Sequence, residues 1–363
     1  MSADERCTSA TVPDRRDEPW LDGMRTTAAG EVPRVKTRLG ALDLLGAFEA
    51  RWAIGRMEYR VPPGLYAVGE PTAESTVLVT ANYKLSFDRL RRVLGGRNAW
   101  LLVLDTKGVN VWCAAGKGTF GTDEIVRQVG ATGLERIVSH RQLVVPQLGA
   151  PGVSAHEVHR RCGFRVVYGP VRAEDLPAFL DAGLRASPEM RRVRFGLLDR
   201  AVLVPVELVM GARHMALIAA SALLLGGLGL DGYSLANVRA HGLTAAAMVV
   251  ASFLAGTVLG PLLLPWLPGR AFAVKGAVLG LVLVGAFALG PWPGPVQTGA
   301  WLHLAAWTLL VPAAVSFVVL NFTGATTFTS LSGVLLEIRY AVPLQKAAAV
   351  LGLGLWVTGL FVR

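Results

Sequence analysis

Five long apolar segments in the second half of the chain limit its fold more than any other feature. A helix that crosses the hydrocarbon core of a membrane needs about 20 apolar residues. The composition agrees, because 52% of the residues are hydrophobic and only 17% are charged, which is too apolar for an average soluble enzyme. We therefore predict an all-α membrane domain of five transmembrane helices over residues 214–363, with the helices near Met215–Leu230, Leu243–Leu264, Ala271–Leu289, Ala300–Leu320 and Ala347–Val362.

The basic residues around these segments predict an orientation. The links after the first and third segments carry one arginine or none, whereas basic residues gather before the first segment and beside the other two links (Arg191, Arg192, Arg194, Arg200, Arg213, Arg270, Lys275, Arg339 and Lys346). By the positive-inside rule the basic side is cytoplasmic. We expect a multi-pass protein of the cytoplasmic (inner) membrane with its N-terminal half in the cytoplasm. The net charge of +10 fits anionic lipid better than nucleic acid, because no basic stripe with interleaved aromatic residues appears.

The first half of the chain has the pattern of an α/β domain. Between residues 36 and 190, apolar runs such as Thr76–Tyr83 and Ala99–Asp105 alternate with stretches of helical spacing. Such alternation is typical of a parallel sheet with helices on its faces. The charged residues 1–35 are expected to be a mobile tail without a secretory signal, and residues 191–213 a basic juxtamembrane linker.

One cysteine, Cys113, lies where a sheet of this kind binds its ligands. Ligands sit beyond the carboxyl ends of parallel strands, and Cys113 follows the predicted strand 99–105 in a short apolar turn that Asn110 can cap and Gly116 can end. The spacing also allows a buried structural cysteine or a catalytic nucleophile, although no pair of His and Asn accompanies it nearby. A zinc or iron–sulfur site is not expected, because the three cysteines are far apart (Cys7, Cys113 and Cys162).

The segment "NVWCAAGK" resembles the cap-helix signature of the HgcA family, the corrinoid (cobalamin-binding) proteins of microbial mercury methylation, at all eight positions. The likeness extends over residues 62–91, 147–183 and 321–345. It includes the plan of a Rossmann-like corrinoid domain, here residues 36–190, followed by five membrane helices. The corrinoid domain is also similar to that of the corrinoid iron–sulfur protein of the acetyl-CoA pathway. This chain lacks the cluster-binding cysteines of that relative and has a membrane region in addition.

The resemblance implies that the Cys113 thiolate is the lower axial ligand of cobalt in a base-off corrinoid. An anionic, electron-donating thiolate favours departure of the opposite methyl group as a carbanion equivalent. Trp112 packs on the macrocycle or anchors the turn, and Lys117 neutralises the thiolate or a corrin group or is an ordinary solvated charge. The implied cofactor-binding residues are Asn110, Val111, Trp112, Cys113, Ala114, Ala115, Gly116, Lys117, Thr80, Asn82, Gly149, Gly152 and Val153.

Two groups outside the signature carry alternatives of their own. Thr80 and Asn82 can hydrogen-bond the corrin amides or satisfy the local backbone. The Gly/Pro loop at 148–156 suits close approach by a large ligand, although a plain strand-to-helix turn has the same composition. The segment 321–334 is unusually polar for a link between membrane helices and is expected to face the cytoplasm.

The implied function is that of a corrinoid-dependent methyltransferase, which passes a methyl group from methylcob(III)alamin to Hg(II) and forms methylmercury. Carbanion transfer leaves Co(III), so two electrons are needed to restore Co(I). A partner ferredoxin, in this family HgcB, and a folate-linked methyl donor system are therefore implied. The alternative is a corrinoid methyl carrier of one-carbon or acetyl-CoA metabolism with another methyl acceptor. A transporter is disfavoured, because the five helices show no internal repeat.

Overall fold

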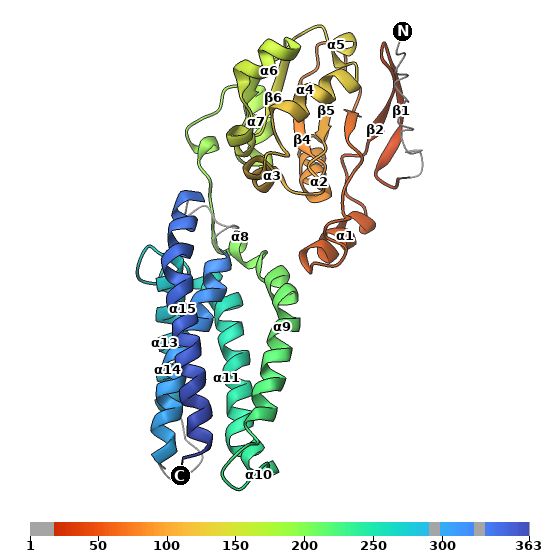
Figure 1. Ribbon diagram of the computed structural model, residues 1–363. Coiled ribbons are helices and arrows are strands. Elements are labelled where there is room, and N and C mark those ends of the chain that lie inside the picture. Colours follow the sequence, from red (N-terminus) through yellow and green to blue (C-terminus); the bar gives the residue numbers. More distant parts are fainter. Residues whose placement is uncertain (1–17, 290–297, 323–330, 363) are drawn as a thin grey trace, which may run out of the picture. The chain divides into compact units, whose positions relative to one another are not determined.

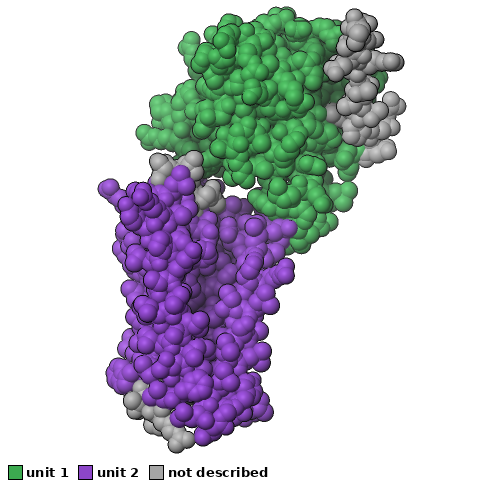
Figure 2. Space-filling view, in the orientation of Figure 1, with its two compact units in different colours: residues 1–50, 54–193 green, residues 51–53, 194–363 purple. Residues whose placement is uncertain are grey.

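The computed structural model describes residues 18–289, 298–322 and 331–362 (Figure 1). Its contacts divide the chain into two compact units. One consists of residues 1–50 and 54–193 and the other of residues 51–53 and 194–363 (Figure 2). The predicted order, an α/β domain followed by a helical region, is confirmed.

The first unit is built on a mixed sheet, whose strands follow one another in the order β1-β2-β3-β5-β4-β6-β7 within the described residues. Strands β5, β4, β6 and β7 are parallel, as predicted. Strand β3, however, runs antiparallel to β5, and β1 and β2 form an antiparallel pair at the edge. The strands are β1 (Leu21–Thr27), β2 (Gly30–Val35), β3 (Gly64–Val68), β4 (Val77–Ala81), β5 (Ala99–Leu104), β6 (Gln142–Val145) and β7 (Arg165–Tyr168).

Helices cover both faces of this sheet. Because side chains alternate along a strand, Leu101 and Leu102 of β5 belong to two different hydrophobic cores. Leu101 lies in the core that contains Phe87 and Phe179, and Leu102 lies in the core with Ala114. The helices of this unit are α1 (Ala41–Arg51), α2 (Lys84–Val93), α3 (Val111–Lys117), α4 (Thr122–Ala131), α5 (Leu134–Ile137), α6 (Ala155–Cys162) and α7 (Leu176–Asp181), with the 3-10 segments η2 (Gln147–Gly152), η3 (Ala173–Asp175) and η4 (Glu189–Arg191).

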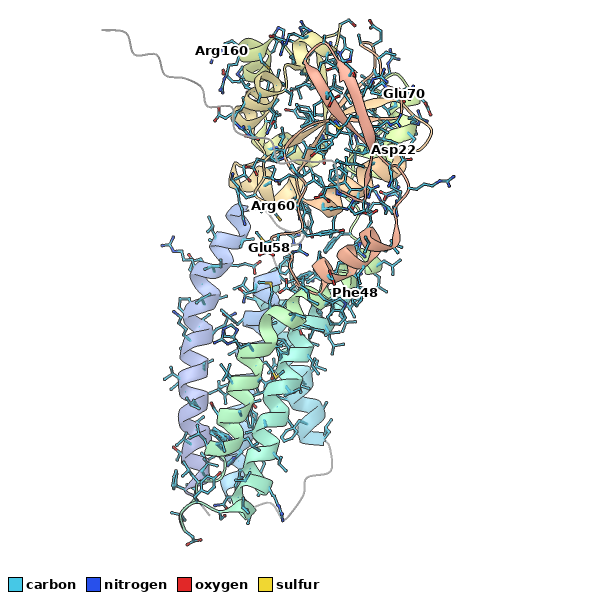
Figure 3. All side chains as sticks on the ribbon, turned by 90° about the vertical axis from the view of Figure 1, so that its right-hand side faces the viewer. Asp22, Phe48, Glu58, Arg60, Glu70 and Arg160 are labelled. Atoms are coloured by element: carbon cyan, nitrogen blue, oxygen red, sulfur yellow. The ribbon has the colours of Figure 1, made fainter. Side chains whose placement is uncertain are left out.

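The prediction of a mobile tail over residues 1–35 is wrong for residues 21–35, which form β1 and β2. Trp20 is buried and its ring packs edge-on against Phe87. Glu70 pairs with Arg25 and with Arg34, and Figure 3 labels Glu70 beside this hairpin. An edge hairpin is held by backbone pairing and a few anchors, so its sequence lacks the apolar runs by which buried strands are recognised. Residues 1–17 lie outside the described residues.

The second unit contains five helical stretches long and apolar enough to cross a membrane, among the residues that the structure describes. They cover residues 197–225, 235–263, 272–289, 300–321 and 333–360, in agreement with the five predicted segments. The helices are α8 (Leu197–Ala201), α9 (Val204–Leu225), α10 (Leu235–Asn237), α11 (Leu243–Leu254), α12 (Gly260–Leu263), α13 (Phe272–Leu289), α14 (Thr298–Asn321) and α15 (Leu331–Leu360), with π-helical turns η5 (Val238–Gly242) and η6 (Ala255–Leu259).

Two of the predicted helix boundaries are wrong. Helix α9 begins at Val204, so much of the expected linker 191–213 is helical. Helix α15 begins at Leu331, and Arg339 and Lys346, expected beside a turn, lie inside it. Apolar segments locate the membrane core, whereas helices continue through the more polar residues that flank it. Of the polar segment 321–334, residues 323–330 lie outside the described residues.

Candidate functional site

Helix α3 carries Cys113 at the carboxyl edge of β5. The side-chain oxygen of Asn110 accepts a hydrogen bond from the backbone N–H of Cys113 at 2.9 Å, which is the predicted N-cap. Gly116 was expected to end the helix but lies inside it. The helix ends instead at Gly118, which adopts the left-handed conformation with φ +81°. Ala114 and Ala115 face the core, while Gly116 and Lys117 are exposed.

The two cysteines of the described chain have different surroundings. The Cys162 thiol donates a hydrogen bond to the carbonyl of Val158 at 3.2 Å, and its side chain packs against a hydrophobic core. Burial raises the pKa of Cys162. Cys113 is half-buried, and its Sγ makes no hydrogen bond within the described part of the chain. The alternative of a structural cysteine therefore describes Cys162 better than Cys113.

The side chain of Asn82 organises the loop between β5 and α3. Its oxygen accepts hydrogen bonds from the N–H of Thr106 at 3.1 Å, from the hydroxyl of Thr106 at 2.9 Å and from the N–H of Gly108 at 3.0 Å. Its amide nitrogen donates to Asp105 Oδ1 at 3.1 Å. Asn82 is almost fully buried, as is Thr80 within β4. These bonds favour the local role for Asn82 over a direct contact with a ligand, since they hold the loop that positions α3.

Acidic side chains fix the same loop from its other side. Glu124 Oε1 accepts a hydrogen bond from the N–H of Asp105 at 2.8 Å. Burial alone would raise the pKa of Asp105, but its hydrogen bonds with Lys107 outweigh that effect and lower the pKa. Lys107 and Gly108 both have positive φ, at +58° and +74°. The loop is thus a tight left-handed turn closed by polar contacts, which gives α3 a defined starting point.

The Gly/Pro loop lies against α3. A Cβ atom on Gly152 would be 2.2 Å from the carbonyl oxygen of Phe120 and 3.1 Å from Cα of Ala115. A Cβ atom on Gly149 would be 2.4 Å from the Phe120 ring. Val153 is buried, and its carbonyl accepts a hydrogen bond from the hydroxyl of Tyr168 at 2.7 Å. The close approach expected at these glycines is present, but the approaching atoms belong to Phe120 and Ala115 of the chain itself.

The remaining residues of the predicted site fall on two sides of α3. Val111 packs against the same core as Ala114 and Ala115. Trp112 is half-buried and is not among the residues of the two cores of this unit. The structure thus gathers Asn82, the cap segment 110–117 and the loop 147–153 around one edge of the sheet.

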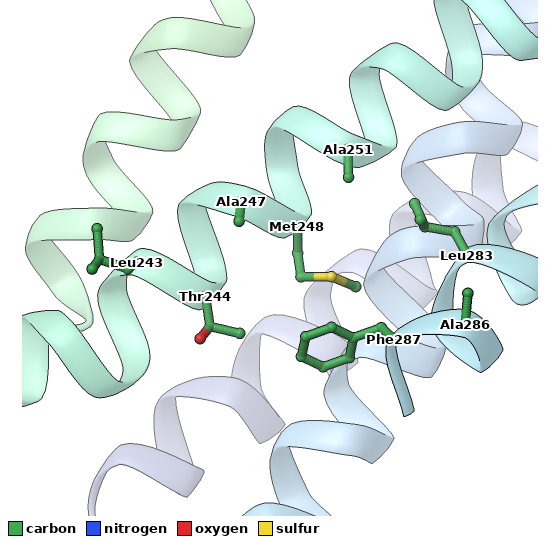
Figure 4. Close-up of a pocket in the computed structure, with 8 residues that line it drawn as sticks. All are labelled: Leu243, Thr244, Ala247, Met248, Ala251, Leu283, Ala286 and Phe287. Carbon is green, nitrogen blue, oxygen red and sulfur yellow. The ribbon is translucent and has the colours of Figure 1, made fainter. Parts of the chain in front are cut away.

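Two other kinds of site were considered, a cluster of metal ligands and a cavity. No group of three or more His, Cys, Asp and Glu side chains suited to hold a metal ion occurs among the residues described. A cavity of about 490 Å³ in the second unit lies between α11 and α13 (Figure 4). Thr244 supplies the polar group of its lining, which otherwise consists of Leu243, Ala247, Met248, Ala251, Leu283, Ala286 and Phe287. Such a lining suits a hydrocarbon chain rather than catalysis.

Comparison with known proteins relates part of the first unit to a known family. Residues 51–180, which include β3 to β7 and α3, match the model of the CdhD family, the CO dehydrogenase/acetyl-CoA synthase delta subunit. The predicted similarity to proteins of the acetyl-CoA pathway is thus confirmed over residues 51–180. The five membrane-type helices lie outside the matched residues.

The individual relatives are named as gamma subunits of an acetyl-CoA decarbonylase/synthase complex, whereas the family model is named for a delta subunit. The acetyl-CoA decarbonylase/synthase complex subunit gamma of Archaeoglobus fulgidus is 31% identical over 128 residues, which are 35% of this chain and 27% of the relative. The subunit gamma of Methanopyrus kandleri is 34% identical over 128 residues, with the same coverage. Subunit gamma 2 of Methanosarcina thermophila is 31% identical over 130 residues. The chain spans about a quarter of the length of these relatives.

Proposed function

We propose that the first unit binds a corrinoid through Cys113 and that the protein is a corrinoid-dependent methyltransferase that converts Hg(II) to methylmercury. The eight-residue match of Asn110–Lys117 to the HgcA cap helix carries this proposal. The family match over residues 51–180 supports the corrinoid. The position of Cys113 beyond the carboxyl end of β5 supports its role as ligand.

The residues present fit a base-off corrinoid. Cys113 offers a half-exposed sulfur without a hydrogen bond in the described chain, and thiolates are strong ligands for transition metals. Coordination requires the thiolate, so binding releases the thiol proton. When bound, the corrinoid supplies a cobalt-held methyl group that can leave with its bonding electron pair. The Cys113 thiolate donates negative charge toward that departure, which a neutral ligand would support less well.

The neighbours of Cys113 keep its sulfur in place. The cap from Asn110 and the turn held by Asn82 fix the start of α3. Trp112, outside both cores, offers its ring to the macrocycle, and the exposed Lys117 offers a positive charge one turn after the thiolate. Of the other residues that we propose to bind the cofactor, Thr80 is near the carboxyl end of β4, and Gly149, Gly152 and Val153 belong to the loop that packs against α3.

Partners follow from the electron balance of the proposed reaction. A methylcorrinoid that lost its methyl group with the electron pair would need two electrons before the next cycle. The three cysteines of the chain are too far apart in sequence to suggest an iron–sulfur cluster. We therefore propose an HgcB-like ferredoxin as the electron donor. A folate-linked system is the proposed source of the methyl group. The second candidate, a methyl carrier of acetyl-CoA metabolism with another acceptor, is favoured by the names of the relatives.

We also propose that the second unit anchors the protein in the cytoplasmic membrane, with the first unit in the cytoplasm. Cations bond backbone carbonyls beside the link between α12 and α13. Arg200 donates to Leu262 at 2.6 Å, and Lys275 donates to Leu267 at 2.6 Å. Lysine and arginine concentrate on the cytoplasmic side of membrane proteins. The positions of Arg200 and Lys275 beside this link support the orientation that the link sequences predict.

The test of this function is a single-turnover assay with the purified full chain loaded with a methylcorrinoid. The amount of methylmercury formed from Hg(II) is measured for the parent, for Cys113→His and for the matched control Cys162→Ala. We expect Cys113→His to retain the corrinoid and to form less methylmercury, and Cys162→Ala to match the parent. Unchanged formation by Cys113→His would refute the electronic role of the thiolate. Transfer to a thiol or metallocluster but not to Hg(II) would favour the second candidate.

A further inference from the structure

Helix α1 has the reverse of the polarity expected of a helix on a soluble domain. Asp43 faces inward and is 9% exposed, whereas Leu42, Leu44 and Leu45 are 64%, 61% and 53% exposed. A surface helix normally turns its apolar side to the core and its charges to water. Burying leucine is favourable and burying a carboxylate is costly, so this arrangement needs a reason.

The inward face is held by a buried ion cluster. Asp43 accepts from Lys84 Nζ at 2.6 Å and pairs with Arg91 at 2.7 Å. Both cations also pair with Asp88, at 2.8 Å each. Lys84, Asp88 and Arg91 are buried on α2, and removing one partner of such a cluster is strongly destabilising. Helix α1 is therefore firmly fixed to the first unit. Its leucines are exposed although the helix is held in place.

The chain that follows α1 shares this character. Ile54 and Met57 are 59% and 60% exposed. The turn is packed against α1, since the Ile54 N–H donates to the Glu49 carbonyl at 2.9 Å and a Cβ on Gly46 would be 2.5 Å from the Tyr59 ring. We call Leu42, Leu44, Leu45, Ile54 and Met57 the α1 apolar surface. Phe48, labelled in Figure 3, is also exposed on α1.

Exposed large hydrophobic side chains are concentrated in one part of the first unit. Outside residues 42–57, its exposed large hydrophobic side chains are Met24 and Val193, as far as the structure describes it. Scattered single apolar residues are normal on a protein surface, but a group on one element indicates an interaction. Three exposed arginines lie next to this group in the chain, namely Arg38, Arg51 and Arg60. The acidic residues of the same stretch that are not buried are two, Glu49 and Glu58.

We propose that the α1 apolar surface inserts into the interface of an anionic membrane. An apolar helix face with basic neighbours is the pattern by which helices lie at the boundary between headgroups and acyl chains. Anionic headgroups complement the excess of arginine. The same chain carries five helices suited to span a membrane, so a lipid surface is available to it. This inference does not depend on the corrinoid.

Insertion of this surface would also position the candidate site. A Cβ on Gly108 would be 2.8 Å from the carbonyl oxygen of Met57, so the apolar turn touches the loop that leads into α3. Asn82 binds the same loop at the Gly108 N–H. Membrane contact at Met57 therefore holds the Cys113 edge of the domain close to the lipid surface.

Spin labelling of the reconstituted full chain tests this proposal. In a background with Cys7, Cys113 and Cys162 replaced by serine, a label is placed at Ile54 or at Met57, and at Arg160 as the matched control. Arg160 lies on α6, where its side chain is 72% exposed, and Figure 3 labels it. Vesicles contain either neutral phosphatidylcholine or a mixture with anionic phosphatidylglycerol. Collisions of the label with oxygen and with a water-soluble nickel complex are measured, and circular dichroism verifies that each labelled chain is folded.

We expect the oxygen-to-nickel collision ratio at positions 54 and 57 to exceed that at 160 several-fold, and to rise further with anionic lipid. Ratios equal to that at 160 would show a water-exposed surface and overturn the proposal. Protection from both reagents would show that protein, such as a second copy of the chain, covers the surface, and would overturn it as well. Labels at Leu44 and Leu45 provide a second pair of positions in case a turn variant fails to fold.

Discussion

The side-chain oxygen of Asn110 accepts a hydrogen bond from the backbone N–H of Cys113, over 2.9 Å. This bond satisfies one of the N–H groups that the first turn of a helix leaves without a partner. Helix α3 covers residues 111–117 only and is too short to be stable by itself. Its cap, the Asn82-bound loop before it and the glycine contacts beside it therefore determine where the Cys113 sulfur lies.

Replacing Asn110 by alanine should loosen α3. Loss of an N-cap costs about 1 kcal/mol. Asn110→Ser should retain most of the stability, because serine also caps helices well. Hydrogen exchange of the amides at 111–117 measures the effect directly. Equal protection in Asn110→Ala and the parent would show that the cap does not hold this helix.

Two glycines near Cys113 should respond in opposite ways to alanine. Gly152→Ala places a methyl group 2.2 Å from the Phe120 carbonyl oxygen, so it should destabilise the first unit by about 1–3 kcal/mol. A Cβ on Gly116 meets no atom within 4 Å, and alanine is the better helix former by about 1 kcal/mol. Urea unfolding of the detergent-solubilised chain compares the two variants. A neutral Gly152→Ala would contradict the packing of η2 on α3.

Acid should weaken the first unit through Asp43. Burial alone would raise the pKa of Asp43, but hydrogen bonds from Lys84, the Gly40 N–H and Arg91 lower it from 3.8 to about 2. A carboxyl group with a lowered pKa stabilises the folded state above pH 3.8, and this contribution disappears as the pH falls through 2. The difference corresponds to about 2 kcal/mol.

Urea unfolding between pH 5 and pH 2 measures this contribution. Asp43→Asn should have a lower unfolding free energy at pH 5, and its stability should fall less steeply on acidification than that of the parent. Parallel pH curves for the two proteins would contradict the assignment.

The sequence predicted the strands of the parallel part of the sheet and failed at its antiparallel edge. Strands β4 and β5 are buried along their whole length and therefore appear as uninterrupted apolar runs. The exposed positions of β1 have no such run. The five membrane segments were visible for the same reason as β4, because burial in lipid or protein selects apolar residues. The extension of α15 through Arg339 was not visible in the sequence, since a helix end among polar residues leaves little hydrophobic pattern.

At the candidate site, the sequence predicted the N-cap of α3 but not the contacts that depend on tertiary structure. Asn110 precedes Cys113 by three residues, so its capping role is a local property. The bonds from Asn82 to the loop at 105–108 join segments that are far apart in sequence. The ion pairs of Asp43 with Lys84 and Arg91 join residues that are even further apart in sequence, and nothing in the local sequence marks these residues as buried. Contacts of this kind become predictable only with a fold.

The proposed orientation predicts which loops face outward. In a cysteine-free background, Leu230→Cys, between α9 and α10, should react with a membrane-impermeant thiol reagent in intact cells. Pro268→Cys, between α12 and α13, should react only in inverted vesicles, because the link containing Arg270 is expected on the cytoplasmic side. Labelling of Pro268→Cys from outside would reverse the topology.

Cys113 as the cobalt ligand is the central claim, and absorption spectroscopy of the corrinoid-reconstituted full chain tests it most directly. We expect the parent and the Cys162→Ala control to show a base-off corrinoid with a cobalt–thiolate band, and Cys113→Ala to lack that band. Cys162 is the suitable control, because its thiol already bonds the Val158 carbonyl. A Cys113→Ala spectrum identical to that of the parent would contradict the account.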